Sequence, residues 1–544
     1  MNIPMIMLML LLNLFLLSIY MLYNNTFLMI KLKLLELLSS SISIDFMLDW
    51  MSLMFMSTVM LISSMIIIFS KYYIPDKEFK QFLTLLLMFV LSMMILIMSN
   101  NLFLMLLGWD GLGLSSYILV IYYQNFSSAA SGTITLLSNR IGDIMILLSM
   151  SMIFLSLNWS FNLTKEFPYT VMLLLMVAAC TKSAQFPFSA WLPMAMAAPT
   201  PISALVHSST LVTAGVFLML RVMNTNHPYT LMFLLLISSS TAIYASMSAN
   251  WEQDLKKIIA LSTLSQIAMM MFAISLNSLN LAYIHLIIHA LFKSTMFLCT
   301  GIMIHESTYQ DMRMMGMNFQ KSPLTLSIMG VNSMALMGIP FMSGFFSKDA
   351  IIENMILTNS NMILLIMMIM SIGMTAAYTI RMTFSSNKSN MKCFPLMSNH
   401  QSTKSFLPIS LLSPLAITSG SWLSWIIIPD QILLINHHNK MTILIILLSG
   451  LLLGSSLQFK SKKYMKLGLS SISLWFMHFL SVIPSHYLSP LMKMFHNNDK
   501  NWQENYGPKK INNSIYMSSM IPESTKSSYL MIISMSILIP LLMM

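Results

Sequence analysis

The residues best suited to chemistry in this sequence are ionisable side chains that stand inside long apolar stretches. His285, His289 and Lys293 recur every four positions, so a helix would place them along one stripe. At about 1.5 Å per residue, the stripe would cover about 12 Å of a hydrocarbon core that is roughly 30 Å thick. A lone buried histidine is more often structural, but two groups that titrate near neutrality, followed by a lysine, predict a proton relay.

Lysines beside interrupted apolar stretches, together with one carboxylate, form a second candidate group. Lys182 and Lys348 each lie next to such a stretch, and Asp110 lies among the glycines of residues 108–113. Ionisable residues inside a membrane are costly and by default mark an ion or proton route. For any one lysine, an ammonium that extends to the membrane surface is the alternative. Together with Lys293 there are three such lysines, and this number favours a functional role. A carboxylate such as Asp110 that approaches a buried lysine would hold the proton on it, and the pair would act as a switch.

Two further groups of polar residues lie within apolar segments. His207 follows Ser203 by four residues and precedes Thr210 by three, so it offers a second relay on a polar helix face. Arg140 and Asp143 are spaced i,i+3 and are interpreted as a structural pair near a membrane face.

Composition excludes most classes of protein. Of the 544 residues, 56% are hydrophobic and only 9% are charged, whereas a soluble globular chain carries about 25% charged residues. The three cysteines form no CxxC pair, and the sequence holds neither a GxGxxG nor a GxxxxGK[ST] motif. Iron–sulfur, zinc, dinucleotide and ATP sites are therefore not expected, and any linked redox chemistry would belong to another subunit. The net charge of +11 suits loop cations that set topology and meet anionic lipid rather than nucleic acid.

The segments that must position these residues predict an all-α polytopic membrane protein. A bilayer-spanning helix needs about 20 apolar residues, and about fifteen segments approach that length. We expect spans near residues 4–23, 47–70, 79–99, 100–122, 130–157, 168–189, 199–223, 229–249, 255–276, 279–303, 322–357, 360–384, 405–428, 441–459 and 526–544. Prolines break two of these helices, within 180–187 and 338–349. Broken helices in corresponding positions of two halves indicate two inverted antiporter-like repeats.

The spans also suggest a division of the chain into functional parts. We expect N-terminal transmembrane helices, a proton-translocating core, additional transmembrane helices, an amphipathic segment and a C-terminal anchor, at residues 1–99, 100–384, 385–459, 460–525 and 526–544. The segment 460–525 is too long for a connecting loop, and its mixture of aromatic and charged residues predicts a helix along the membrane interface. Pro484, Pro490 and Gly507-Pro508 would interrupt or kink that helix, and a flexible loop is the alternative.

Residue usage bears on the origin of the chain. It holds 61 methionines, which packing does not explain because leucine fills a lipid-facing helix at least as well. A biased genome is the simpler cause. Residues 4–23 lack a positively charged n-region and a cleavage site, so we expect a retained first span, and no Arg-rich transit peptide precedes it. Both observations predict a chain that is encoded in an organelle genome, which the resemblance described next implies to be the mitochondrial one.

Several of these motifs together resemble the chain 5 family of mitochondrial NADH:ubiquinone oxidoreductase, respiratory complex I. The resemblance rests on GWDGLGLSSY at 108–117, KSAQFPF at 182–188, WLP at 191–193, PTPISALVHSST at 199–210, HALFK at 289–293 and GFFSKD at 344–349. It covers about residues 45–385 by motif and the rest by architecture. As a set, the motifs are very specific.

The resemblance implies an antiporter-like subunit that conducts protons across the inner mitochondrial membrane. NADH oxidation and ubiquinone reduction would proceed in other subunits, which would hold the NADH, FMN, iron–sulfur and ubiquinone sites, so no cofactor is expected in this chain. The implied partners are the other membrane-arm subunits, especially the neighbouring antiporter-like chain 4, and lipids such as cardiolipin. The family also implies that segment 460–525 is a lateral helix beside these neighbours.

The family's functional residues match particular positions of this sequence. Lys182 resembles the lysine that the family uses as a proton switch in the first half of the chain. Asp110 resembles the acidic residue that pairs with that lysine. Many relatives carry glutamate where this chain has Asp110, and the shorter side chain leaves open whether it contacts Lys182 directly or through water.

The remaining matches lie in the centre and the second half of the chain. His207, His289 and Lys293 are similar to the family's central relay. Lys348, with Asp349, resembles the exit lysine of the second half.

Two other functions are compatible with the same residues. A subunit of a multisubunit cation/proton antiporter would share the motifs, although the methionine bias and the long segment 460–525 argue against it. A membrane scaffold that conducts no protons is the third possibility, and it predicts that neutralising Lys182 or Lys293 leaves pumping intact.

Overall fold

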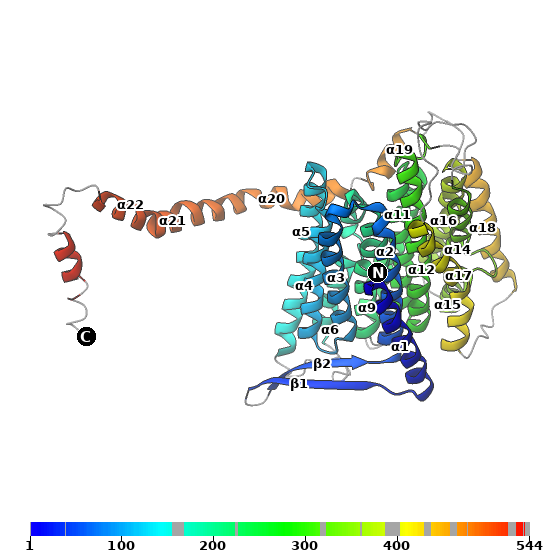
Figure 1. Ribbon diagram of the computed structural model, residues 1–544, viewed down its shortest axis with the longest axis horizontal. Helices are drawn as coiled ribbons and strands as arrows, with labels where there is room; N and C mark the ends of the chain where they lie inside the picture. The colour runs from blue at the N-terminus through cyan, green and yellow to red at the C-terminus, as the bar shows by residue number, and fades with distance from the viewer. Residues whose placement is uncertain are drawn as a thin grey trace. The chain divides into compact units, whose positions relative to one another are not determined.

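The computed structural model shows a bundle of membrane-length helices and a separate run of helices near the C-terminus (Figure 1). The chain divides into two compact units, Met1–Met477 and His478–Met544. The structure describes residues 2–37, 40–154, 168–223, 227–315, 322–358, 362–386, 403–428, 437–456, 465–475, 477–519, 529–536 and 538.

The first unit is built almost entirely of helices. Its first part contains α1 (Asn2–Asn24), α2 (Trp50–Tyr73), α3 (Asp76–Met98), α4 (Leu102–Val120), α5 (Phe126–Phe154) and α6 (Tyr169–Lys182). Its middle contains η1 (Phe188–Ala190), α7 (Trp191–Met194), η2 (Ala195–Ala197), α8 (Thr200–Ile202), η3 (Ser203–Thr210), α9 (Leu211–Val222), α10 (Pro228–Trp251), α11 (Leu255–Ser275) and α12 (Leu279–Ser307). Its last part contains α14 (Pro323–Met337), α15 (Ser343–Leu357), α16 (Met362–Ser386), α17 (Thr403–Ile427), α18 (His437–Ser456) and α19 (Met465–Ile472).

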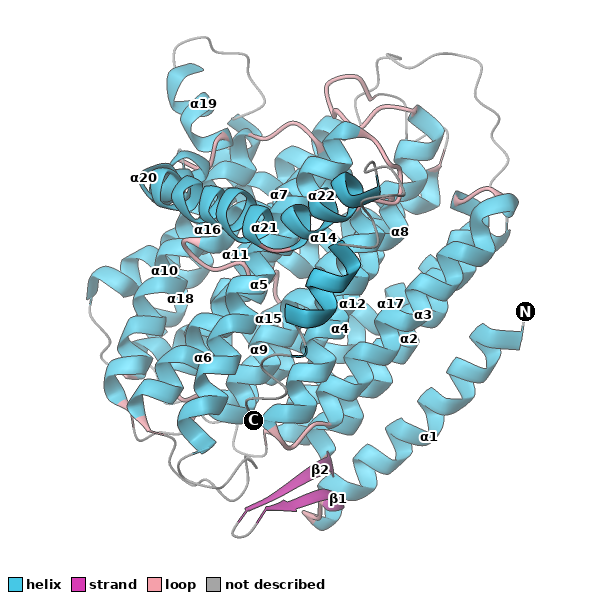
Figure 2. Cartoon of the chain, turned by 90° about the vertical axis from the view of Figure 1, so that its left-hand side faces the viewer, coloured by secondary structure: helices cyan, strands magenta, loops and turns pink. Residues whose placement is uncertain are grey.

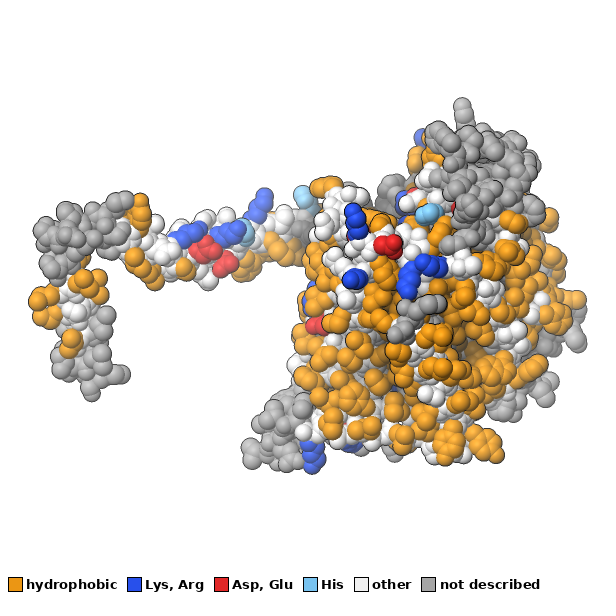
Figure 3. All heavy atoms as spheres, viewed as in Figure 1, with side chains coloured by type: hydrophobic (Ala, Val, Ile, Leu, Met, Phe, Trp, Pro, Cys, Tyr) orange, Lys and Arg blue, Asp and Glu red, His pale blue; other side chains and the backbone are white. Residues whose placement is uncertain are grey.

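Eleven helices among the described residues are long and apolar enough to cross a membrane. Three of these spans, Thr200–Val222, Leu255–Ser275 and Leu279–Ser307, are buried along their whole apolar window, whereas only 17% of the window of α1 is buried. A helix that is apolar all round is stable inside a bundle, where neighbours replace lipid. In Figure 3, hydrophobic side chains form a broad band over the visible face of this unit, and most of its charged groups gather in the upper half of that face. The expected helical membrane class is therefore confirmed.

The all-α expectation is wrong in one place, because a two-stranded hairpin joins α1 to α2 at one end of the bundle (Figure 2). Strands β1 (Leu28–Leu37) and β2 (Ser40–Leu48) pair antiparallel, with Lys31 opposite Asp45. The physical reason lies in alternation: apolar and polar residues alternate through residues 30–33 and 41–45, which is the two-residue period of a strand.

Both helix breaks that the prolines predict are present. Helix α6 ends at Lys182, and short helical pieces follow it up to the π-helical turn η3. Helix α14 ends before Gly338, which adopts φ +84°, and α15 starts at Ser343. The expected spans at 168–189 and 322–357 consequently appear as shorter helices rather than as single rods.

The C-terminal unit contains a helical segment where an amphipathic helix is expected. It contains α20 (Met477–Asn497), η4 (Asn498–Gln503), α21 (Glu504–Tyr506) and α22 (Pro508–Ser519). Helix α20 continues through Pro484 and Pro490, and the helical run is interrupted at Gly507. Of the expected final span at 526–544, residues 529–536 and 538 are helical, and the others lie outside the described residues.

Candidate functional site

Lys182 occupies the C-terminal end of the broken helix α6 and is fully buried. Its Nζ donates a hydrogen bond of 3.2 Å to the carbonyl of Trp109 and lies 5.2 Å from the centre of that indole ring. Gly113 of α4 also faces the ammonium, since a Cβ there would stand 3.5 Å from Nζ, in ordinary van der Waals contact. The cation is thus held by a carbonyl, by an aromatic face and by the negative end of its own helix dipole.

A charge cluster on α4 and α5 lies next to this lysine. Arg140 Nη1 is 3.3 Å from Asp110 Oδ1 and 3.1 Å from Asp143 Oδ2, so it bridges the two carboxylates. Both carboxylates are close enough to Lys182 to interact with it electrostatically. Among the described residues, the ion pair of Asp110 is with Arg140, and Lys182 binds Trp109 instead.

Arg140 and Asp143 therefore belong with the candidate site, although the sequence suggested only a structural pair. One signal that pointed to their place is Gly142, which lies between them. A Cβ at Gly142 would stand 2.3 Å from Thr181 Oγ1, so α5 packs directly against the end of α6. This close approach brings the cluster to the turn that carries Lys182.

His207 lies on the π-helical turn η3 and is buried. Neither ring nitrogen has a hydrogen-bond partner among the described residues, and the ring lies edge-on to Trp191 at 6.3 Å. The expected partners are used elsewhere: Ser203 Oγ donates to the carbonyl of Thr200, and Thr210 Oγ1 donates to the carbonyl of Leu205. Isolated π-turns inside helices are frequently found at functional sites.

The stripe on α12 is buried, as its spacing predicts. His285 connects two neighbouring helices, because Nδ1 is 2.8 Å from Ser347 Oγ on α15 and Nε2 is 3.2 Å from Gln266 Oε1 on α11. This arrangement fits a neutral imidazole that is protonated at Nε2. The ring of His289 lies 6.4 Å from that of His285, and its nitrogens have no hydrogen-bond partner within the described part of the chain.

Lys293 ends the stripe deep inside the bundle. The side chain is fully buried, and Nζ donates to Ser262 Oγ on α11. No ion pair of Lys293 with a carboxylate is found in the described ranges. A hydroxyl partner offers no counter-charge, so the charge of this lysine is balanced by no bonded carboxylate among the described residues.

Lys348 lies at the second helix break. Its Nζ donates to the carbonyl of Leu336, in the last turn of α14, where backbone carbonyls have no partner within the helix. Gly344 lets α15 start against α14, because a Cβ there would stand 2.0 Å from the carbonyl oxygen of Ala335. Ser347, the neighbour of Lys348, is the residue that contacts His285, so the stripe on α12 reaches the second break through one side chain.

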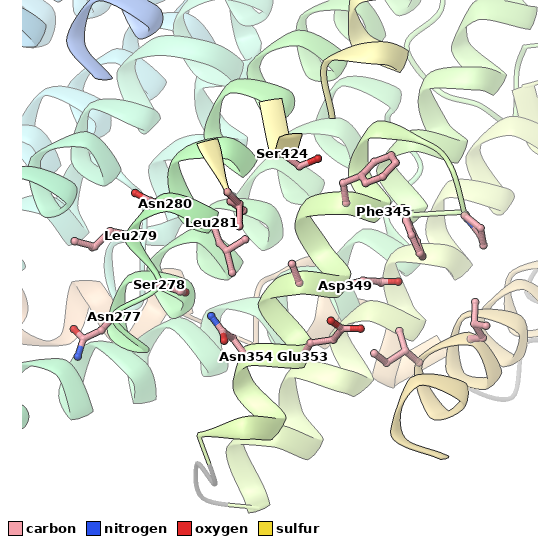
Figure 4. A pocket seen from close by; sticks show the side chains of 16 residues that line it. Asn277, Ser278, Leu279, Asn280, Leu281, Phe345, Asp349, Glu353, Asn354 and Ser424 are labelled. Atoms are coloured by element: carbon pink, nitrogen blue, oxygen red, sulfur yellow. The ribbon is translucent and has the colours of Figure 1, made fainter. Parts of the chain in front are cut away.

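Asp349 lines a pocket of about 910 Å³ at the end of α12 where the helix begins. The pocket also includes Glu353 and Asn354 from α15 and the turn formed by residues 277–281. Figure 4 shows these polar side chains together with Phe345 and Ser424 around the pocket. The pocket thus provides a wide, partly acidic opening next to Lys348.

One buried lysine was missed from the sequence. Lys256, in the first turn of α11, donates to the carbonyl of Ala198 at 3.1 Å, just after η2. It stands beside Lys257 at the start of an apolar segment, which is typical of a charge at the membrane interface. Nothing in the sequence therefore indicated that Lys256 is buried. Lys256 and Lys348 therefore share one feature: each ammonium binds a backbone carbonyl at a break in a helix.

The arrangement consists of proton donors and acceptors rather than of metal ligands. Within the described part of the chain, no group of three or more His, Cys, Asp or Glu could hold a metal ion. Buried imidazoles, hydroxyls and ammonium groups exchange protons by breaking one N–H or O–H bond and forming another, with no other bond changed.

Comparison with known proteins gives consistent results along the whole chain. Residues 99–375 match the family described as NADH:quinone oxidoreductase/Mrp antiporter, TM, residues 35–83 match the complex I chain 5 N-terminus, and residues 378–544 match the NADH dehydrogenase subunit 5 C-terminus. The chain is 42% identical to NADH-ubiquinone oxidoreductase chain 5 of Aedes aegypti, over 96% of this chain and 94% of that protein. It is 39% identical to the same chain of Lumbricus terrestris, over 96% and 95%.

A solved structure shares the fold. The Mrp complex from Dietzia sp. DQ12-45-1b contains a chain that superposes with a TM-score of 0.67 and 21% identity. The match covers 97% of this chain and 59% of that chain.

Proposed function

The chain belongs to the chain 5 family of NADH:ubiquinone oxidoreductase, and from this premise we propose that its buried Lys, His and Asp residues form a proton route. It is accordingly an antiporter-like, proton-translocating membrane subunit of complex I. The observation that carries the proposal is the bonding of the buried lysines. Lys293 and Lys348 bind a hydroxyl and a carbonyl rather than a carboxylate. Lys293 can therefore gain or lose a proton without leaving a bonded carboxylate behind. Lys348 exchanges its proton beside the carboxylate of Asp349.

In the first half, the charge cluster acts as the switch. Arg140 and Lys182 compete for Asp110, and in the described conformation Arg140 holds it. When the Arg140–Asp110 pair opens, the carboxylate becomes free to bind Lys182 and to keep its proton. When the pair closes, Lys182 loses this partner and passes the proton on toward His207 and the stripe on α12.

In the second half, protons leave through the second helix break. When His285 becomes protonated at both ring nitrogens, it gives the Nδ1 proton to Ser347 Oγ, and Ser347 releases its own proton to Lys348 beside the carboxylate of Asp349. The pocket around Asp349 then provides contact with water at the end of the bundle that also carries the hairpin. Tyr283 near the start of α12 donates a hydrogen bond to the carbonyl of Met51 near the start of α2. Both helices therefore begin at the end of the bundle that carries the hairpin, and the pocket lies at that end.

The setting of the subunit follows from the same premise. Helix ends and a connector at the opposite end carry Lys71, Lys77, Lys80, Lys257 and Arg313. The positive-inside rule then predicts that this end faces the mitochondrial matrix. The chain would span the inner membrane about fifteen times, counting broken helices and the last segment, as two inverted repeats. Its redox cofactors would lie in other subunits.

Neighbours of the subunit can be proposed in the same way. Complex I subunits are its partners, and among them we propose the antiporter-like chain 4, with cardiolipin filling the gaps. The helical run from Met477 to Ser519 supports a lateral helix along the membrane surface, since it combines Phe495 and Trp502 with Lys493 and Lys500.

The proposal is tested by replacing one buried lysine in the intact complex. Lys293→Met removes the proton-binding group but keeps the length of the side chain, so NADH-driven proton uptake into vesicles should be lost while the complex still assembles. Lys257→Met is the matched control, because Lys257, in the first turn of the neighbouring helix α11, pairs with Asp254 at 2.9 Å and is half-exposed. Normal proton uptake in Lys293→Met would refute the route.

A multisubunit cation/proton antiporter remains the second candidate, supported by the shared fold. It predicts sodium-dependent proton movement by the chain without NADH. Proton uptake that requires NADH and is indifferent to sodium excludes this alternative.

A further inference from the structure

A polar cluster lies where α2 and α12 end, at the end of the bundle away from the hairpin. Tyr72 Oη is 3.1 Å from His305 Nδ1, and the two ring centres are 4.9 Å apart. The ring of Tyr73 lies 5.9 Å from the same imidazole. His305 is exposed, whereas both tyrosines are half-buried. A surface imidazole is therefore oriented by one tyrosine and flanked by a second.

Tyr73 connects this cluster to the first broken helix. It interacts with both the side chain and the backbone of Thr200, which is fully buried. Within the described residues, Thr200 Oγ1 has no hydrogen bond of normal geometry. Gly301, one helical turn before His305, allows the close fit, because a Cβ there would stand 2.9 Å from Thr200 Oγ1. The hydroxyl thus lies between the surface cluster and the interior, near Tyr73 but without a well-formed hydrogen bond among the described residues.

Thr200 also begins the helical segment that carries His207. The two residues are seven positions apart, which is about 10 Å along a helix axis. Both ring nitrogens of His207 are buried and unpartnered in the described part of the chain. Buried polar atoms without a partner are costly, and in proteins they usually bind ordered water. Lys256 holds the same break from the side of α11 through its bond to Ala198.

We propose that His305, Tyr73 and Thr200 form a proton inlet from the basic face to His207, with Tyr72 orienting His305. The inlet rests on the proton route proposed above and extends it to the surface. Imidazole takes up a proton at the surface, and each hydroxyl accepts one proton as it releases its own. Ordered water carries the proton over the roughly 10 Å between Thr200 and His207. One proton thus leaves the aqueous phase and one arrives at His207, with no other bond made or broken and no oxidation.

An aromatic belt at the membrane surface is the alternative explanation for tyrosines at this level. A belt tyrosine directs its hydroxyl outward to head groups. Tyr73 instead contacts Thr200 inside the bundle, and Glu306, next to His305, is within electrostatic range of Tyr72. A carboxylate at the mouth raises the local concentration of protons, which suits an inlet.

The test uses the intact complex in vesicles that are energised with NADH. In His305→Ala and in Tyr73→Phe, proton uptake and NADH oxidation per assembled complex should both slow by about tenfold. This loss is smaller than the ~100-fold contribution of a positioned proton-transfer group, because water still reaches the face. Tyr122→Phe is the control, since Tyr122 at the same face donates to Glu78 at 2.8 Å outside the inlet. Millimolar imidazole should restore His305→Ala to more than half of the wild-type rate, which a structural defect would not allow.

The outcomes separate the inlet from the route. If Lys293→Met abolishes proton uptake while His305→Ala and Tyr73→Phe behave as wild type, the inlet is wrong and the route stands. A loss in His305→Ala that imidazole does not restore also overturns the role of His305. If Lys293→Met pumps normally, the route itself fails. Should His305→Ala not assemble, Tyr73→Phe decides alone, because it keeps the ring and removes only the hydroxyl.

Discussion

Removal of the positive charge at Arg140 is the sharpest test of the switch in the first half. The guanidinium lies 3.3 Å from Asp110 and 3.1 Å from Asp143. At such a distance, two unit charges interact by about 1 kcal/mol in water and about 5 kcal/mol at an effective dielectric constant of 20. The side chains of Arg140 and Asp110 are 43% and 36% exposed, so the lower value of about 1 kcal/mol applies.

This energy predicts the size of the effect. In Arg140→Met, Lys182 becomes the only cation close to both carboxylates and holds its proton more firmly. A difference of about 1 kcal/mol corresponds to about fivefold slower release of the proton, and turnover of the complex should fall by the same factor. Arg140→Lys keeps the charge, so its turnover should stay within about twofold of wild type. The small remaining loss of turnover would come from the missing forked geometry of the guanidinium.

The assay measures NADH:ubiquinone turnover and proton uptake in the same vesicles, normalised to assembled complex on native gels. Wild-type rates in Arg140→Met would refute the reasoning. Equal losses in Arg140→Met and Arg140→Lys would also refute it, because they would assign the effect to the shape of the side chain rather than to its charge.

Four further predictions concern the other parts of the chain. Lys182→Met should stop proton uptake in a complex that still assembles, and a normal ratio of protons to electrons would contradict this. Lys293→Ala should slow pumping more than His285→Ala, because only the first change deletes the buried ammonium; direct comparison of uptake rates decides it. Gly344→Ala should destabilise the second break by about 1–3 kcal/mol, since the new methyl group would lie 2.0 Å from a carbonyl oxygen. A lower melting temperature of the complex would show it. Truncation near residue 460 should leave the buried lysines intact but weaken the membrane arm, which native gels of detergent-treated membranes would reveal.

Family and function were predictable because they depend on local sequence. The motifs around Asp110, Lys182 and Lys348 were sufficient to recognise the chain 5 family, and the relatives confirm it. The stripe of His285, His289 and Lys293 and both helix breaks were likewise predictable, since a spacing of four residues and a proline act within one or two turns of the chain.

The partners of these residues could not be predicted, because they depend on how helices far apart in sequence pack. Only the tertiary structure shows that Arg140 takes Asp110 and that His285 contacts Ser347. It also shows that Lys256 and Lys348 bind carbonyls that breaks in other helices leave exposed. Periodicity determines which face of a helix a side chain occupies, but the glycines and breaks of its neighbours determine which atom that face meets.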